Sequence, residues 1–260
     1  MDHAGQRVAD ERTARAARNN AAWCDTVCRA HGRPGEFLGT LWINRHAVPR
    51  FYPNAVTLVG ATAAPAQLED LRALVDVGLA GGWGVKDSFC ALDLGPLGFG
   101  IRFDAEWIWR SPALPPPRPA RTAIRWARVR SASALAAWEV AWHAATGDGT
   151  RAADDTIFRP ALLADPDVAV FAGYAGSRVV AGAIANCAAD VVGLSNRFAL
   201  PADTADAAAG CVAAAVDTFP GMPIVGYERG RDLATARALR FETLGRLRVW
   251  VKTVSEYGAA

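Results

Sequence analysis

Two neighbouring side chains in the last third of the chain, Tyr227 and Glu228, are the best candidates for proton transfer. They follow an apolar run, residues 223–226, whose branched side chains predict a buried strand. A carboxylate at the end of such a strand can take a proton from an amine, and a phenol can donate one. The alternatives for Glu228 are structural, since it can pair with Arg229 or Arg231 or cap the helix that follows.

A second set of polar side chains interrupts two apolar strands. Asn196 and Arg197 lie within residues 191–200, which are otherwise rich in branched and aromatic residues, and Asn186 and Cys187 lie in the strand before. Such side chains either line a substrate site or occupy the solvent side of an alternating strand. We treat Asn186, Asn196 and Arg197 as candidate substrate contacts, and Cys187 as a small buried side chain.

Three potential metal ligands lie near the N-terminus. Cys24, Cys28 and His31 have helical i, i+4, i+7 spacing and can share one face. A structural zinc site needs four ligands, and the sequence names no fourth. We therefore expect core packing of the first helix and no metal. The sequence also contains no P-loop and no dinucleotide-binding fingerprint.

The composition limits the classes of partner. Hydrophobic residues make up 52% and charged residues 21% of the 260 residues, which predicts a packed core. The net charge of +2 is too small to indicate a nucleic acid partner. No apolar run reaches the roughly 20 residues that a membrane helix needs, and no signal-peptide core is present. With five cysteines and no disulfide pattern, we expect a cytoplasmic protein without a membrane or nucleic acid partner.

A proline-rich stretch, residues 111–120, divides the chain. Proline lacks the amide hydrogen that a helix or ladder needs and favours an extended shape, so this stretch predicts a linker. We expect a first domain over residues 1–110, a second domain over residues 121–254, and a tail at residues 255–260.

Apolar periodicity and turn residues predict the elements of each part. In the second part we expect a helix capped by Ser131, an Ala-rich central helix and a final strand–helix–strand unit. The expected strands of the second part are residues 123–129, 168–174, 179–185, 191–200, 224–228 and 247–252, and its helices are residues 131–145, 203–219 and 232–239. In the first part the expected helices are residues 9–30 and 65–79, and the strands are residues 37–43, 54–59, 84–92 and 102–109.

The order of elements in the second part resembles the GNAT superfamily of N-acetyltransferases. The resemblance rests on the buried strand at residues 223–228, the short helix opened by Arg231–Asp232–Leu233, the aromatic knuckle at residues 240–245 and the final strand around Trp250. It covers about residues 122–252. It implies a mixed α/β (α+β) acyl-CoA N-acyltransferase fold and the transfer of an acyl group from acetyl-CoA, or another acyl-CoA, to the amine of a small molecule or peptide.

A weak internal repeat extends this resemblance to the first part. The first part contains, in order, residues 56–58, a helix, Val85, Phe99 and Trp107. The second part contains, in the same order, residues 192–194, a helix, Val225, Phe241 and Trp250. We therefore expect a smaller GNAT-like half domain before the linker.

The resemblance also implies where acyl-CoA would bind. In the family, the loop after the fourth strand opens the central helix and holds the CoA pyrophosphate with backbone amides and the positive end of that helix. The matching residues in this chain are Phe198, Ala199, Leu200, Ala202, Thr204 and Ala205, of which Phe198 to Leu200 would supply backbone contacts to the acyl-CoA chain.

This segment departs from the family pattern. It has no glycine and no basic residue, Pro201 removes one amide donor, and Asp203 and Asp206 bring negative charge. At about 4 Å, each like charge would cost roughly 1–4 kcal/mol against a pyrophosphate. The tyrosine that the family often places on the helix after the fifth strand is also missing, so Tyr227 and Glu228 are the remaining candidates for proton handling.

Two other functions stay open because of these departures. One is a non-catalytic GNAT-derived protein that binds a ligand or a partner without CoA. The other is a GNAT-derived enzyme of another class, such as a decarboxylase or lyase. An added half domain can cover a pocket or form an interface, so a homodimer is among the expectations.

Overall fold

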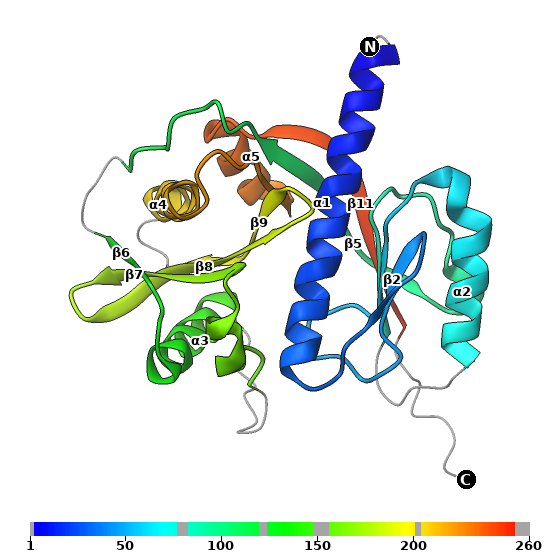
Figure 1. The fold of residues 1–260 in the computed structure, drawn as a ribbon, viewed down its shortest axis with the longest axis horizontal. Helices are drawn as coiled ribbons and strands as arrows, with labels where there is room; N and C mark the ends of the chain where they lie inside the picture. Colours follow the sequence, from blue (N-terminus) through cyan, green and yellow to red (C-terminus); the bar gives the residue numbers. More distant parts are fainter. Residues whose placement is uncertain (1–2, 77–82, 120–123, 148–155, 201–203, 253–260) are drawn as a thin grey trace. The chain divides into compact units, whose positions relative to one another are not determined.

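The computed structural model describes residues 3–76, 83–119, 124–147, 156–200 and 204–252 (Figure 1). Contacts divide the chain into two compact units, one formed by Met1–Trp107 with Leu244–Ala260 and the other by Ile108–Thr243. Both units are mixed α/β structures built on a β-sheet. The role of the proline-rich stretch as a domain boundary stays a prediction.

The first unit is built around a short parallel pair of strands joined by a helix. Strand β3 is parallel to β4, with Ala55 opposite Val85, and α2 connects them. The described elements are α1 (His3–Ala30), β1 (Glu36–Phe37), β2 (Leu41–Ile43), β3 (Ala55–Thr57), η1 (Ala61–Ala63), α2 (Ala64–Asp76), β4 (Trp83–Asp87), η2 (Gly95–Leu97) and β5 (Gly100–Arg110). The last strand of the chain, β11 (Glu242–Lys252), lies antiparallel to β4.

The expected single strand at residues 37–43 is wrong, because this stretch folds as a hairpin. Strands β1 and β2 are antiparallel, with Phe37 opposite Trp42, and the Leu38 amide donates to the Leu41 carbonyl at 2.7 Å. Gly39 and Thr40, between Leu38 and Leu41, form the turn. A lone glycine within a strand pattern can mark such a turn.

The two helices of the first unit cover opposite faces of its sheet (Figure 1). Successive strand residues point to opposite faces, so Leu41 and Ile43 pack with Leu71 and Leu74 of α2. On the other face Trp42, Val56 and Leu58 pack with Ala21, Cys24 and Cys28 of α1. Burial raises the pKa of both thiols, that of Cys28 to about 12, which makes them inert core residues.

The second unit has the same parallel strand–helix–strand motif inside a longer antiparallel sheet. Its strand order is β10-β9-β8-β7-β6, in which only the β9–β10 pair is parallel. The described elements are β6 (Arg125–Arg128), α3 (Ala132–Thr146), η3 (Pro160–Ala164), β7 (Val168–Ala175), β8 (Arg178–Ala188), β9 (Val191–Ala199), α4 (Thr204–Thr218), β10 (Ile224–Glu228) and α5 (Gly230–Ala238). The expected cap of α3 is confirmed, because the Ser131 hydroxyl accepts from the Ala134 amide at 3.2 Å.

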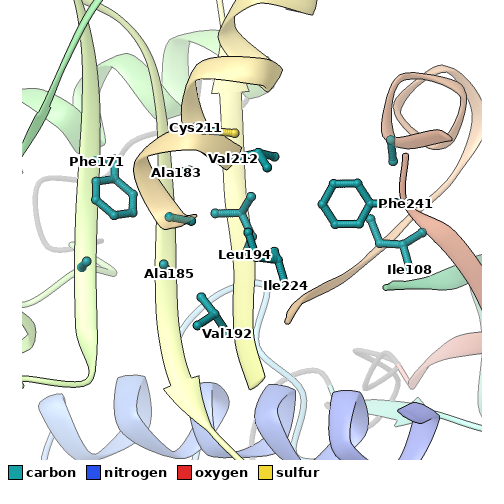
Figure 2. Close-up of a cluster of buried hydrophobic side chains, with 13 residues drawn as sticks. Ile108, Phe171, Ala183, Ala185, Val192, Leu194, Cys211, Val212, Ile224 and Phe241 are labelled. Atoms are coloured by element: carbon teal, nitrogen blue, oxygen red, sulfur yellow. The ribbon is translucent and has the colours of Figure 1, made fainter. Parts of the chain in front are cut away.

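The core of the second unit lies between α4 and one face of this sheet. Figure 2 shows Val192 and Leu194 of β9 near Cys211 and Val212 of α4, with Ile224 of β10 beside them. On the opposite face, α3 packs its Trp138 ring edge-to-face against Phe198 and Phe158, with both centroid separations at 5.2 Å. Helices on both faces leave strand ends as the place where backbone and polar side chains can meet a ligand.

The first unit contains a strand from the far part of the sequence. Residues Leu244 onward of β11 belong to this unit, where Trp250 lies opposite Val85 of β4. The last three residues of β5 belong to the second unit, where Ile108 packs near Phe241 (Figure 2).

Candidate functional site

Strands β9 and β10 pair over a short distance and then continue without a shared ladder. Their register pairs Val192 with Ile224 and Gly193 with Val225. At the next position the backbones are still close, since a Cβ on Gly226 would lie 3.0 Å from the Leu194 carbonyl oxygen. We call the unpaired remainder, residues 195–199 and 227–228, the parted segment.

A β-bulge in β9 shapes the parted segment. Gly182 of β8 lies opposite Phe198, but Ile184 lies opposite Ser195, so β9 holds one extra residue there. The extra residue is Asn196, with a left-handed φ of 50°, a conformation that asparagine adopts more readily than most residues. Its amide donates to the Ser195 hydroxyl at 3.0 Å.

The bulge changes the face to which each following side chain points. Leu194 faces the α4 side, and strict alternation would put Phe198 on that side as well. The extra residue instead turns Phe198 to Trp138 on the α3 side and gives the α4 side to Arg197. The bulge thus brings a cation to the open end of β10.

Arg197 and Glu228 join β9 and β10 across the parted segment. The Arg197 Nε donates to the Glu228 Oε1 at 3.1 Å, and Nη2 donates to the same oxygen. Each side chain is 17% exposed. Among the described residues no donor bonds to Oε2. One carboxylate oxygen is therefore held by Arg197, and the other keeps its lone pairs.

Burial opposes charge on both partners, and the attraction between them favours it. Burial raises the pKa of the Glu228 carboxyl, Arg197 acts in the opposite direction, and Asp232 of α5 adds to the rise. Burial also disfavours the charge on Arg197, but the Glu228 carboxylate more than offsets this effect. The pKa of Arg197 therefore lies above its usual range. A carboxyl group whose pKa is raised is a stronger base than an exposed carboxylate, which suits it to accept a proton.

The other predicted polar residues do not meet at Glu228. Successive residues of β10 point to opposite faces, so Tyr227 leaves the strand on the side away from Glu228. Asn186, 5% exposed, also lies on the far face, since its neighbour Ala185 belongs to the α4-side core. Asn196 shapes the backbone of the bulge.

Five of the six residues predicted to contact acyl-CoA lie within the described part of the chain. The Leu200 amide donates to the Val180 carbonyl at 2.8 Å, so it is already used by β8. Because hydrogen-bonding groups alternate along a strand, the amide of Ala199 points to the β10 side. The Phe198 side chain is buried against Trp138. Thr204 and Ala205 begin α4, and Ala202 lies outside the described residues.

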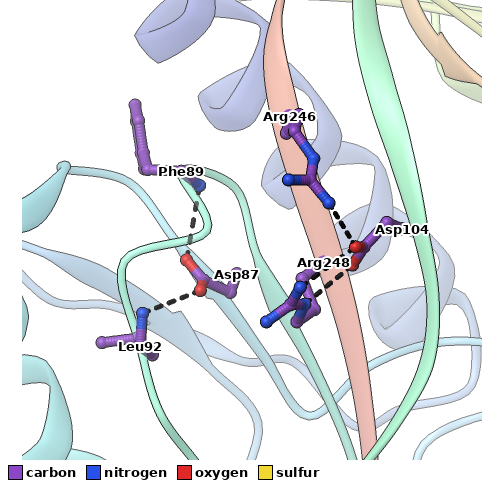
Figure 3. A network of polar contacts seen from close by, with 6 residues as sticks. All are labelled: Asp87, Phe89, Leu92, Asp104, Arg246 and Arg248. Carbon is purple, nitrogen blue, oxygen red and sulfur yellow. Dashed lines mark hydrogen bonds and ion pairs between the residues drawn. The ribbon is translucent and has the colours of Figure 1, made fainter.

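A second polar cluster belongs to the first unit and is structural (Figure 3). The buried Asp87 carboxylate accepts from the amides of Leu92 at 2.9 Å and Phe89 at 3.3 Å, and so fixes the loop after β4. Asp104 of β5 accepts from Arg248 at 2.7 and 3.0 Å and also from Arg246. Burial raises the pKa of Asp87, whereas Arg248 lowers that of Asp104.

In the part of the chain that the structure describes, no group of three or more His, Cys, Asp and Glu side chains could hold a metal ion. None of the helices in that part is long and apolar enough to cross a membrane.

Comparisons with known proteins identify the fold. No family model matches the sequence, and no curated protein matches it. Among solved structures, a GCN5-related N-acetyltransferase from Kribbella flavida is 19% identical, with a TM-score of 0.61 over 93% of this chain and 97% of that chain. A GCN5-related N-acetyltransferase from Sphaerobacter thermophilus is 9% identical, with a TM-score of 0.52 over 76% of this chain and 71% of that chain.

A conserved Staphylococcus epidermidis protein of unknown function is similar as well, at 13% identity and a TM-score of 0.53 over 82% of this chain and 84% of that chain. At these identities the likeness establishes the fold. The chain therefore has the mixed α/β fold of GNAT N-acetyltransferases, as the order of its strands and helices predicts.

Proposed function

We propose that this chain is an acyl-CoA-dependent N-acyltransferase that moves an acetyl or other acyl group to the amine of a small molecule or peptide. The observation that carries the proposal is the Glu228 carboxylate, held by Arg197 at the open end of two parted strands with one oxygen unbonded. The GNAT fold supports the same reaction class.

The proposed reaction takes two protons from the acceptor ammonium and supplies one to the leaving thiolate. The Glu228 Oε2 takes the first proton, and the amine nitrogen then attacks the thioester carbonyl carbon. The Ala199 amide, which points to the β10 side, is our candidate donor to the oxyanion of the tetrahedral intermediate. As this intermediate collapses, the C–S bond breaks, the nitrogen loses its second proton and the thiolate takes one up, which leaves a neutral amide and a thiol.

The site suits the amide chain of CoA better than it suits the pyrophosphate. The parted segment offers backbone groups to an extended amide chain, and the N-terminus of α4 offers its positive dipole end to a phosphate. Asp206 in the first turn of α4 opposes that charge. We therefore expect the acyl and amide portion of CoA to contribute more to binding than its pyrophosphate does.

The test is kinetic and uses Glu228→Gln, which keeps the shape and hydrogen-bonding capacity of the side chain. Turnover is followed as free CoA thiol released from acetyl-CoA in the presence of a panel of primary amines. We expect kcat to fall at least about 100-fold, the usual size of a general-base contribution, with acetyl-CoA affinity unchanged. Unchanged turnover in Glu228→Gln would remove Glu228 from the mechanism.

The second candidate is a GNAT scaffold that binds a ligand or a partner without CoA. The loop without glycine and the negative charge of Asp206 favour it. This candidate predicts that neither acetyl-CoA nor CoA binds at millimolar concentration.

A further inference from the structure

We infer that Arg197 is a positioning residue for proton transfer: it fixes the Glu228 carboxylate within the parted segment, with Oε1 anchored and Oε2 directed to the acceptor amine. The inference rests on the proposed role of Glu228 as the base.

The hydrogen-bond pattern is asymmetric in a way that suits this role. Two nitrogen atoms of Arg197, Nε and Nη2, donate to the same oxygen of Glu228, Oε1. In the usual fork-to-fork pair each nitrogen donates to its own carboxylate oxygen. A guanidinium presents its donors in a rigid plane, so two bonds to one oxygen restrict the torsions of a long glutamate side chain. Oε2 keeps its lone pairs for a proton.

The β-bulge at Asn196 places Arg197 and Phe198 on opposite faces of β9. Without the extra residue at Asn196, the arginine would point to the α3 side, where Trp138 and Phe198 form an apolar cluster. Bulges are frequent next to active sites because they re-aim a side chain. In this chain the bulge re-aims Arg197 to Glu228.

The charges around the pair leave Arg197 as the group that opposes protonation of Glu228. From α5, Asp232 acts on Glu228 in the unfavourable direction, and from α4 the Cys211 thiol faces Arg197. Of the described groups that act on Glu228, Arg197 alone carries positive charge. Its removal would free the carboxylate to move and would favour its protonated form.

The direct test measures the titration of Glu228 itself. Full-length protein labelled with 13C at glutamate side chains is titrated by NMR as wild type, Arg197→Lys and Arg197→Met, with Glu228→Gln used to assign the signal. We expect the Glu228 midpoint to rise by about one pH unit or more in Arg197→Met and by less in Arg197→Lys, which keeps the cation. A midpoint that stays within about 0.3 units in folded Arg197→Met would overturn the inference.

The kinetic test separates positioning from a merely structural role. With acetyl-CoA and an amine that the wild type accepts, we expect the acidic limb of kcat/KM in Arg197→Met to move to higher pH by the same amount as the NMR midpoint, at unchanged KM for acetyl-CoA. A uniform loss of activity at every pH, with the limb in place, would contradict the role. If Arg197→Met does not fold, Arg197→Lys carries the test with a smaller expected shift.

The two measurements fail independently. If the wild type neither binds nor turns over acetyl-CoA, the proposed function is wrong, whatever the NMR midpoint does. If the wild type is active, and substitution of Arg197 changes neither the NMR midpoint of Glu228 nor the acidic limb of kcat/KM, only the inference is wrong.

Discussion

The side chain that faces Glu228 is decided by the backbone conformation of one residue, Asn196. Its left-handed φ inserts the extra residue in β9 and gives Arg197 the face that Phe198 would otherwise occupy. The Asn196 amide group bonds to Ser195, so the side chain itself supports the turn. A single residue type thus connects the strand geometry to the chemistry of the site.

Substitution of Asn196 tests this connection. Glycine tolerates the left-handed region, so Asn196→Gly should retain the bulge and the Arg197–Glu228 pair. A β-branched residue is strained there, so Asn196→Val should lower the free energy of unfolding by about 1–2 kcal/mol relative to Asn196→Gly. Urea unfolding of the two variants gives the difference. Equal stability would show that the left-handed conformation is not required.

Sequence reasoning named candidate site residues but could not give their arrangement. Tyr227 and Glu228 lie on the expected strand, and the Ser131 cap is confirmed, because strands and caps depend on near neighbours in the sequence. The pairing of Arg197 with Glu228 bridges 31 positions and depends on the bulge. A glycine would have signalled such a bulge, and β9 carries asparagine at that position instead.

At the scale of elements, the contact between β5 and β11 is strengthened by charge. Asp104 is 30% exposed and holds two arginines of β11, Arg246 and Arg248. Arg248 also lies over the Trp250 ring, with the guanidinium carbon 5.4 Å from its centroid. A partly exposed pair of this kind contributes modestly, and a shared carboxylate raises the value above that of an isolated surface pair.

The contribution of Asp104 should depend on pH. Arg248 depresses the folded-state pKa of Asp104 below the ordinary aspartate value of 3.8, so the stabilisation is present above that value and is lost as the pH falls through the folded-state pKa. Asp104→Asn should therefore lower the free energy of unfolding by about 0.5–1 kcal/mol at pH 7, and the difference should vanish in strong acid.

The matched control for Asp104 is Glu36→Gln. Glu36 pairs with Arg45 at 3.6 Å in a more exposed setting, with the two side chains 58% and 41% exposed. We expect a change of no more than about 0.3 kcal/mol for this variant. Denaturant unfolding of both variants between pH 2 and pH 7 is the measurement. A loss in Asp104→Asn that is the same at every pH would contradict the electrostatic account.

At the scale of the molecule, the first unit depends on a strand from the far part of the sequence. Strand β11 belongs to the first unit from Leu244 onward and pairs with β4 over five residues, Arg248 to Lys252. The repeat in the sequence predicts two similar motifs, and both parallel strand–helix–strand motifs are present. The pairing of β11 with β4 could not be predicted, because Val85 and Val225 are equally apolar neighbours for a final strand.

Truncation tests this dependence. A chain that ends at Thr243 removes the part of β11 that completes the first unit, so Trp83–Asp87 should lose its hydrogen-exchange protection while the β7–β8 hairpin of the second unit retains it. The control ends at Lys252 and keeps β11. Protection of β4 that is equal in the two truncated chains would show that β11 does not stabilise the first unit.

The central claim is that the parted segment of a GNAT fold binds acyl-CoA, and isothermal titration calorimetry with acetyl-CoA tests it most directly. The wild type should bind saturably, and Ala199→Trp, which adds a large side chain to the α4 side of the parted segment, should weaken binding at least about tenfold in a folded protein. No heat and no thermal shift with millimolar acetyl-CoA or CoA would contradict the account and leave a GNAT scaffold with another ligand.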